Sequence, residues 1–133
     1  MFATLNRVGL LALALAALTG CGSSTAPLAA FQPQISNTAD NFQFQATGVT
    51  NVTSTVTYPW SNSGTAASVN QATTVTAGTA TLTILDQNGT QVYTKDLSAN
   101  GTFTTSAGVT GSWTIKVVLT NYSGTANFRA QKM

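Results

Sequence analysis

The chain has 133 residues, enough for one domain, and only 6% of them are charged, against about 25% in an average soluble protein. A hydrophobic share of 43% with a net charge of +2 excludes the class of disordered chains, which combine low hydrophobicity with high net charge. The same small charge excludes a basic patch for nucleic acid, and a single cysteine excludes an internal disulfide.

The first predicted element is an N-terminal leader. Residues 1–7 carry one cationic side chain, Arg7, and residues 8–18 (VGLLALALAAL) form an uncharged apolar run. The run has the length of the hydrophobic region of a signal peptide and is too short to span a bilayer as a helix. Small residues and then the only cysteine, Cys21, follow it. This order predicts export from the cytoplasm.

The residues that end the leader, Leu18-Thr19-Gly20-Cys21, carry a resemblance to a known family. They resemble the lipobox of bacterial lipoproteins, in which an aliphatic residue and two small residues precede a cysteine. The resemblance implies a diacylglyceryl thioether on Cys21, cleavage between Gly20 and Cys21, and frequent acylation of the new amine. Two or three acyl chains anchor a protein stably, whereas one anchors it marginally. The alternative is an ordinary secreted protein in which Cys21 is incidental or a buried free thiol.

The residue after the cysteine, Gly22, bears on localisation. In lipoproteins of enteric-type Gram-negative bacteria, an aspartate at this position favours retention in the inner membrane. Because Gly22 is not aspartate, the resemblance implies a lipid-anchored protein of the outer membrane. In a Gram-positive host the anchor would lie in the cytoplasmic membrane.

The remaining chain divides into a tether and a domain. The stretch GSSTAPLAAFQPQ is small, polar and interrupted by two prolines, which is typical of a flexible segment. We therefore predict a cleaved signal peptide over 1–20, the lipidated cysteine and a flexible tether over 21–35, and one folded domain over 36–133.

The domain shows apolar and polar residues alternating with a period of two, which is typical of strands with one face in a core and one in solvent. Threonine fills many of the polar positions and is β-branched, which favours strands. No helical period occurs after Ile35. The alternating runs begin at Phe42, Val52, Ala80, Trp113 and Ala126.

Turn signals separate these runs. Asn88-Gly89 and Asn100-Gly101 predict hairpins because both residues of each pair tolerate positive φ. Residues 121–124 predict a turn that joins the last two strands. We expect an all-β fold of about eight or nine short strands, packed as a small antiparallel β-sandwich of jelly-roll or immunoglobulin-like type.

Residues 111–131 resemble the ends of small bacterial accessory sandwiches, namely the pre-peptidase C-terminal domain and the proprotein-convertase P domain. In those domains a Gly-x-Trp-x-aliphatic strand precedes a final hairpin, and Gly111 and Trp113 begin such a strand here. The resemblance implies a packing pattern, not a functional motif. The acidic residues with which some of these domains bind calcium have no counterpart in this chain.

The composition argues against catalysis. The chain has no histidine and no glutamate, which excludes a Ser-His-Asp triad, a Cys-His pair and an imidazole zinc site. Its three acidic residues are Asp40, Asp86 and Asp96. Asp86 and Asp96 flank one predicted hairpin and could approach each other, but a turn residue and a surface charge are the simpler interpretations. We expect no enzyme activity, no cofactor and no bound metal.

Aromatic residues offer the best candidates for a binding site. Tyr58, Trp60 and Asn62 lie at a predicted strand end before an Asn- and Ser-rich loop, where a tryptophan could stack on a sugar ring. The alternative is that Trp60 caps the core. Tyr93 and Tyr122 are expected to be half exposed. The basic residues Lys116, Arg129 and Lys132 are expected to share the solvent face of the final hairpin.

Two functions follow. The first is a non-catalytic, membrane-anchored envelope lipoprotein, held through Cys21, whose β-sandwich binds a protein partner or supports a surface assembly. The second is a carbohydrate- or matrix-binding module that uses Trp60 and the neighbouring amide-rich loop.

Overall fold

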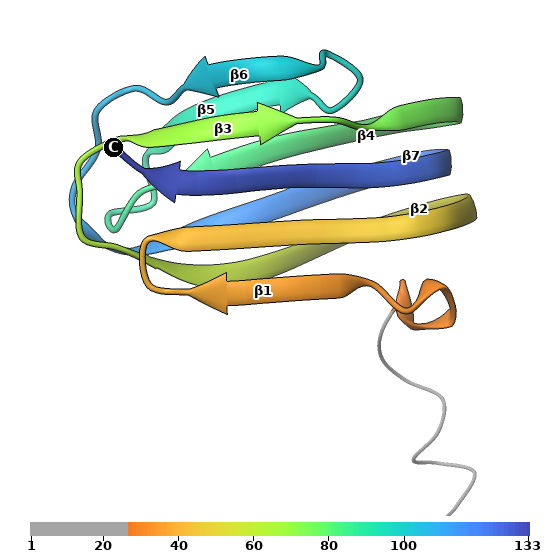
Figure 1. The fold of residues 1–133 in the computed structure, drawn as a ribbon, viewed down its shortest axis with the longest axis horizontal. Coiled ribbons are helices and arrows are strands. Elements are labelled where there is room, and N and C mark those ends of the chain that lie inside the picture. Colours follow the sequence, from red (N-terminus) through yellow and green to blue (C-terminus); the bar gives the residue numbers. More distant parts are fainter. Residues whose placement is uncertain (1–26) are drawn as a thin grey trace, which may run out of the picture.

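The computed structural model describes residues 27–133, and these form an all-β antiparallel structure (Figure 1). A short 3₁₀ helix precedes seven strands. The elements are η2 (Ala29–Phe31), β1 (Gln34–Thr38), β2 (Asn41–Asn62), β3 (Ala67–Gln71), β4 (Thr74–Leu85), β5 (Gln91–Asp96), β6 (Gly101–Thr104) and β7 (Gly111–Lys132). The fold class predicted from the sequence is thus confirmed.

The sheet folds over on itself because its two longest strands bend and pass through both layers (Figure 1). The first layer has the order β1, first half of β2, second half of β7, β3, β6. The second layer contains the second half of β2, the first half of β7, β4 and β5. The pairing of β2 with β7 shifts register three times between Ala46 and Ser54, which is where both strands turn the corner.

The number of strands differs from the expected eight or nine. The runs that begin at Phe42 and Val52 are one strand, β2, and those that begin at Trp113 and Ala126 are also one strand, β7. The predicted turn over 121–124 is a bend inside β7. Asn51 and Asn121 have positive φ there, and pairing resumes on both sides of the bend. Positive φ serves a bulge as well as a hairpin turn, so residue type alone does not separate them.

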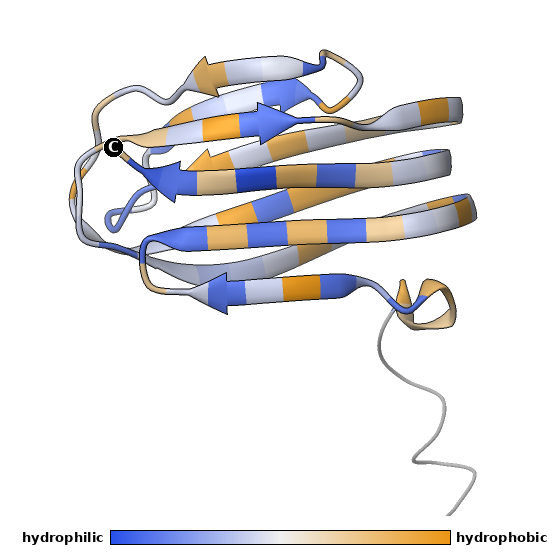
Figure 2. Ribbon diagram, in the orientation of Figure 1, coloured by the Kyte–Doolittle hydropathy of each residue, from blue (hydrophilic) through white to orange (hydrophobic). Residues whose placement is uncertain are grey.

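The core lies between the two layers and is filled by the inward faces of the strands. Figure 2 shows the alternation of hydrophobic and hydrophilic residues along β2 and β7 that produces these faces. In the first layer Phe128 stacks between Phe42 and Phe44, with ring centroids 5.9 and 5.3 Å away. In the second layer Trp60 and Trp113 meet edge to face at 5.9 Å.

The folded structure begins before the predicted domain boundary at residue 36. Leu28 is 3% exposed and belongs to the core, and Phe31 packs against that core. The predicted tether over 21–35 is therefore structured from residue 28 onward. Residues 27–133 contain no helix that is both long and apolar enough to cross a membrane.

Candidate functional site

The predicted lipidation and cleavage residues, Cys21 and Gly20, lie outside the described residues. Their assignment rests on the sequence motif alone.

Trp60, the predicted stacking residue, is in the core. Its side chain is 1% exposed, its indole Nε1 donates a hydrogen bond to the carbonyl of Thr38 at 3.2 Å, and its ring meets Trp113 edge to face. No face of the ring is available to a sugar. The alternative interpretation of the sequence, that Trp60 covers the core, describes its position.

The two companions of Trp60 also have structural roles. Asn62 is fully buried, and its side chain accepts a hydrogen bond from the Gly64 amide at 2.9 Å, which shapes the turn between β2 and β3. Tyr58 is half-buried and packs against Phe42 and Phe44, and this burial raises its pKa. The three residues therefore do not combine into a surface site.

Two further expectations are wrong. Tyr93 is 7% exposed and Tyr122 is fully buried, so neither is half exposed. The basic residues are separated as well, because the bend of β7 places Lys116 in the second layer and Arg129 in the first. Lys132 lies 3.8 Å from the carboxylate of Asp40.

The carboxylates are engaged in loops and turns. Asp86 Oδ1 accepts hydrogen bonds from the amides of Asn88 and Thr90, and Asp96 Oδ1 accepts one from the amide of Ser98. Asp40 accepts hydrogen bonds from the amide and hydroxyl of Ser63. Within residues 27–133 no three potential metal-ligating side chains of His, Cys, Asp or Glu gather together.

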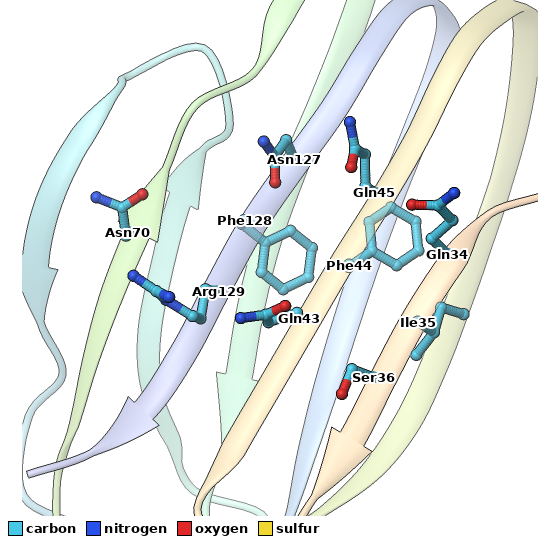
Figure 3. Close-up of a pocket in the computed structure, with 10 residues that line it drawn as sticks. All are labelled: Gln34, Ile35, Ser36, Gln43, Phe44, Gln45, Asn70, Asn127, Phe128 and Arg129. Atoms are coloured by element: carbon cyan, nitrogen blue, oxygen red, sulfur yellow. The ribbon is translucent and has the colours of Figure 1, made fainter.

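A hollow of about 430 Å³ lies on the first layer (Figure 3). Its lining comes from four adjacent strands, β1, β2, β7 and β3. The lining residues are Gln34, Ile35, Ser36, Gln43, Phe44, Gln45, Asn70, Asn127, Phe128 and Arg129. Phe44 and Phe128 have buried side chains, so the outward-pointing side chains of β2 and β7 in this hollow are polar.

The strand register arranges these polar side chains in two rows across the layer. Gln34 lies opposite Gln45, and Gln45 lies opposite Asn127. The second row runs from Ser36 through Gln43 and Arg129 to Asn70. Directly opposed residues of an antiparallel pair point to the same face, so each row forms a continuous polar strip.

Arg129 is the only charged residue that lines the hollow. The three acidic residues of the chain are elsewhere: Asp40 is near Lys132, and Asp86 and Asp96 belong to the turns that follow β4 and β5. Among residues 27–133 the only ion pair is Lys132 with Asp40. The Arg129 guanidinium is exposed and faces no carboxylate.

Sequence reasoning missed this site for a topological reason. The alternation correctly places Gln43, Gln45, Asn127 and Arg129 on solvent-facing positions. It does not show that β2 lies beside the end of β7, which is distant in sequence. A concentration of amides over residues 32–45 and again over 121–131 is the signal that could have suggested the site.

Comparisons with known proteins give no relative that identifies the chain. No family model matches, and no curated protein matches. A crystal structure described as accessory secretory protein 1, 2 and 3 in Streptococcus pneumoniae is similar at 9% identity and TM-score 0.37, covering 77% of this chain and 87% of that one. A structure of the infectious bursal disease virus Gt strain is similar at 18% identity and TM-score 0.33, covering 75% of this chain and 30% of that one.

Proposed function

We propose that this chain is a non-catalytic lipoprotein of the bacterial envelope, anchored through Cys21, whose β-sandwich binds a partner at the membrane surface. The observation that carries the proposal is the ordered series of Arg7, the apolar run over 8–18 and the lipobox ending at Cys21. Gly22 favours the outer membrane of a Gram-negative host as the location.

The position of the domain start supports a role close to the membrane. Among residues 27–133 Leu28 is the first buried side chain, and residues 22–27 lie between it and Cys21 in the sequence. A chain extends by at most about 3.6 Å per residue, so this segment reaches roughly 20 Å. A partner of the domain would therefore be held near the lipid headgroups.

The chemistry of the described domain supports a binding role. The sequence supplies no histidine and no glutamate, and all three aspartates accept hydrogen bonds within loops or turns. A general acid or base needs a carboxylate or imidazole that can reach a substrate. The polar hollow of the first layer offers hydrogen-bonding groups instead.

The test of the anchor is Cys21→Ser in cells fed a labelled fatty acid. We expect the wild-type protein to carry the label in the membrane fraction and the variant to persist as an unlabelled precursor. A matched control, Cys21→Ser combined with Ser23→Cys, restores a thiol two residues away from the lipobox position and should also stay unlabelled. If Cys21→Ser is still cleaved and released normally, the chain is an ordinary secreted protein.

Carbohydrate binding is the second candidate. The burial of Trp60 removes the aromatic platform on which the candidate rested, but the hollow provides a different set of amides.

A further inference from the structure

We propose that the hollow on the first layer binds an acidic polysaccharide, with the amides of Gln34, Gln43, Gln45 and Asn127 contacting sugar hydroxyls and Arg129 pairing with a carboxylate. The proposal deepens the proposed function by naming a ligand class and a site. It rests on the binding role of the domain and does not depend on the lipid anchor.

The four amides are available to a ligand. Within residues 27–133, the side chains of Gln34, Gln43, Gln45 and Asn127 make no hydrogen bond to the protein, although other polar side chains nearby do. A primary amide supplies two donor hydrogens and an accepting oxygen, and a sugar hydroxyl both donates and accepts. The amides are therefore matched in type to a surface rich in hydroxyl groups.

The four amides are also regularly spaced across the strands. Neighbouring strands are about 4.8 Å apart and residues on one face recur about every 7 Å along a strand, so the two rows form a regular grid. Figure 3 shows Gln34, Gln45 and Asn127 on successive strands, with Gln43 and Arg129 beside them. An extended chain of sugar rings lying across the strands could contact several amides in turn.

The lining of the hollow carries one positive charge and no negative charge. Arg129 is opposite Gln43 on β2 and Asn70 on β3, and no carboxylate lines the hollow. A guanidinium presents planar donors that match a carboxylate in a two-bond arrangement. An anionic group on the ligand would supply the partner that the protein itself does not provide.

The chemistry of the lining favours a glycan over a protein partner. Protein interfaces obtain most of their binding energy from a few hot-spot residues, chiefly Trp, Tyr and Arg, that cluster in well-packed, fully desolvated pockets. The outward side chains here are amides, a serine and an arginine, and only Ile35, 39% exposed, adds exposed apolar surface. The hollow of about 430 Å³ is within the ~300–1,000 Å³ range of small-molecule sites.

The experiment uses the full mature protein in detergent and measures binding to polygalacturonate, with methyl-esterified polygalacturonate as the matched uncharged ligand. We expect binding to the acid form that weakens as salt is added. Arg129→Gln should weaken binding of the acid form about tenfold or more and should leave the weaker binding of the ester unchanged. Gln43→Ala should weaken both forms by about threefold to tenfold.

The matched control is Lys116→Gln, which removes one positive charge from the same strand in the second layer. It should bind both forms as the wild type does. Absence of binding to polygalacturonate would overturn the proposal, as would equal losses in Lys116→Gln and Arg129→Gln. A protein partner crosslinked at Gln43 and Arg129 without glycan binding would also overturn it.

These outcomes are separate from those of the anchor test. A fatty-acid label on Cys21 without polygalacturonate binding would reject only the site. Polygalacturonate binding by a protein that carries no label would reject only the anchor.

Discussion

At the residue scale, Asp86 connects two loops. One oxygen accepts the amides of Asn88 and Thr90, both at 2.9 Å, within the turn after β4. The other accepts the amide of Val109 at 2.9 Å, in the loop before β7. The hydrogen bond from Val109 is the main cause that lowers the pKa of Asp86, the bonds from Thr90 and Asn88 add to it, and burial acts in the opposite direction.

A lowered pKa makes folding depend on pH. The ionised Asp86 stabilises the folded state above its ordinary pKa of 3.8, and this contribution is lost as pH falls below that value towards the folded-state pKa. Asp40, whose pKa is lowered chiefly by the amide and hydroxyl of Ser63, adds a contribution of the same sign. We therefore expect the midpoint temperature of thermal unfolding, followed by circular dichroism, to fall when the pH is lowered below 4.

Asp86→Asn should lower the unfolding midpoint temperature at pH 7, because the side-chain NH2 of asparagine would face a backbone N–H donor. The variant should also show a smaller further drop of the midpoint on acidification. A variant that followed the wild-type profile in parallel would show that Asp86 is not a source of the acid sensitivity.

A second prediction concerns a buried polar network. The Tyr93 hydroxyl donates to Gln71 Oε1 at 2.6 Å, and Gln71 Nε2 donates to the carbonyls of Asp96 and Ala99. Burial raises the pKa of Tyr93 to about 12. Tyr93→Phe leaves Gln71 Oε1 without its donor and should cost about 1–3 kcal/mol of unfolding free energy, measured by urea titration.

The matched control is Tyr58→Phe. The Tyr58 hydroxyl makes no hydrogen bond within residues 27–133, and phenylalanine would keep the ring contacts. Loss of this hydroxyl should therefore change the free energy of unfolding by less than about 0.5 kcal/mol. Equal effects of the two substitutions would contradict the assigned role of Gln71.

At the element scale, the corner of the sheet depends on glycine. Gly78 in β4 has φ of +69°, and a Cβ there would collide with the carbonyl oxygens of Thr120 and Asn121 in the bend of β7. Gly48 in β2 has a similar φ of +65°, but nothing lies near the position of its Cβ. A comparison of substitutions at the two residues therefore distinguishes the cost of positive φ from the cost of close approach between strands.

Gly48→Ala should therefore cost only about 1–2 kcal/mol, the price of a left-handed alanine. Gly78→Ala adds a collision between strands and should cost roughly 3 kcal/mol or more. Urea unfolding of the two variants provides the comparison. If their losses are equal, the close approach of β4 and β7 does not contribute to stability.

Some strands and turns of this fold can be predicted from the sequence, and others cannot. Alternation identified β2, β4 and β7 and their inward faces but not the four shorter strands, and Asn88-Gly89 lies in the turn between β4 and β5 as predicted. The hairpin predicted at Asn100-Gly101 is wrong, because β5 and β6 on either side of it pair with β4 and β3 and not with each other. The turn predicted over 121–124 is instead a bend inside β7, because positive-φ residues such as Asn121 favour a turn and a bulge alike. The burial of Trp60 and the rows around Arg129 depend on pairing between distant strands, which local patterns do not contain.

At the scale of the whole molecule, the two layers share β2 and β7 and should unfold together. Both tryptophans are in the second layer, so their fluorescence reports on that layer, whereas circular dichroism reports on all strands. Val69 lies in the core of the first layer on β3. Val69→Ala removes buried methyl groups and should cost about 2 kcal/mol.

We expect both signals to give one coincident urea transition, and Val69→Ala to shift both midpoints equally. A fluorescence midpoint that stayed at the wild-type value while the dichroism midpoint moved would show that the layers unfold separately.

During synthesis β7 emerges after the strands with which it pairs. β1 pairs only with β2, β5 pairs only with β4, and β6 pairs only with β3. The three strands β2, β3 and β4 all pair with β7. Before β7 emerges, the chain can form only two-stranded ribbons, which are marginal in water and expose one apolar face. Every ribbon must wait for the last strand, and during that interval its open edges are exposed to aggregation. A chaperone that shields strand edges would therefore matter most for this chain before β7 appears.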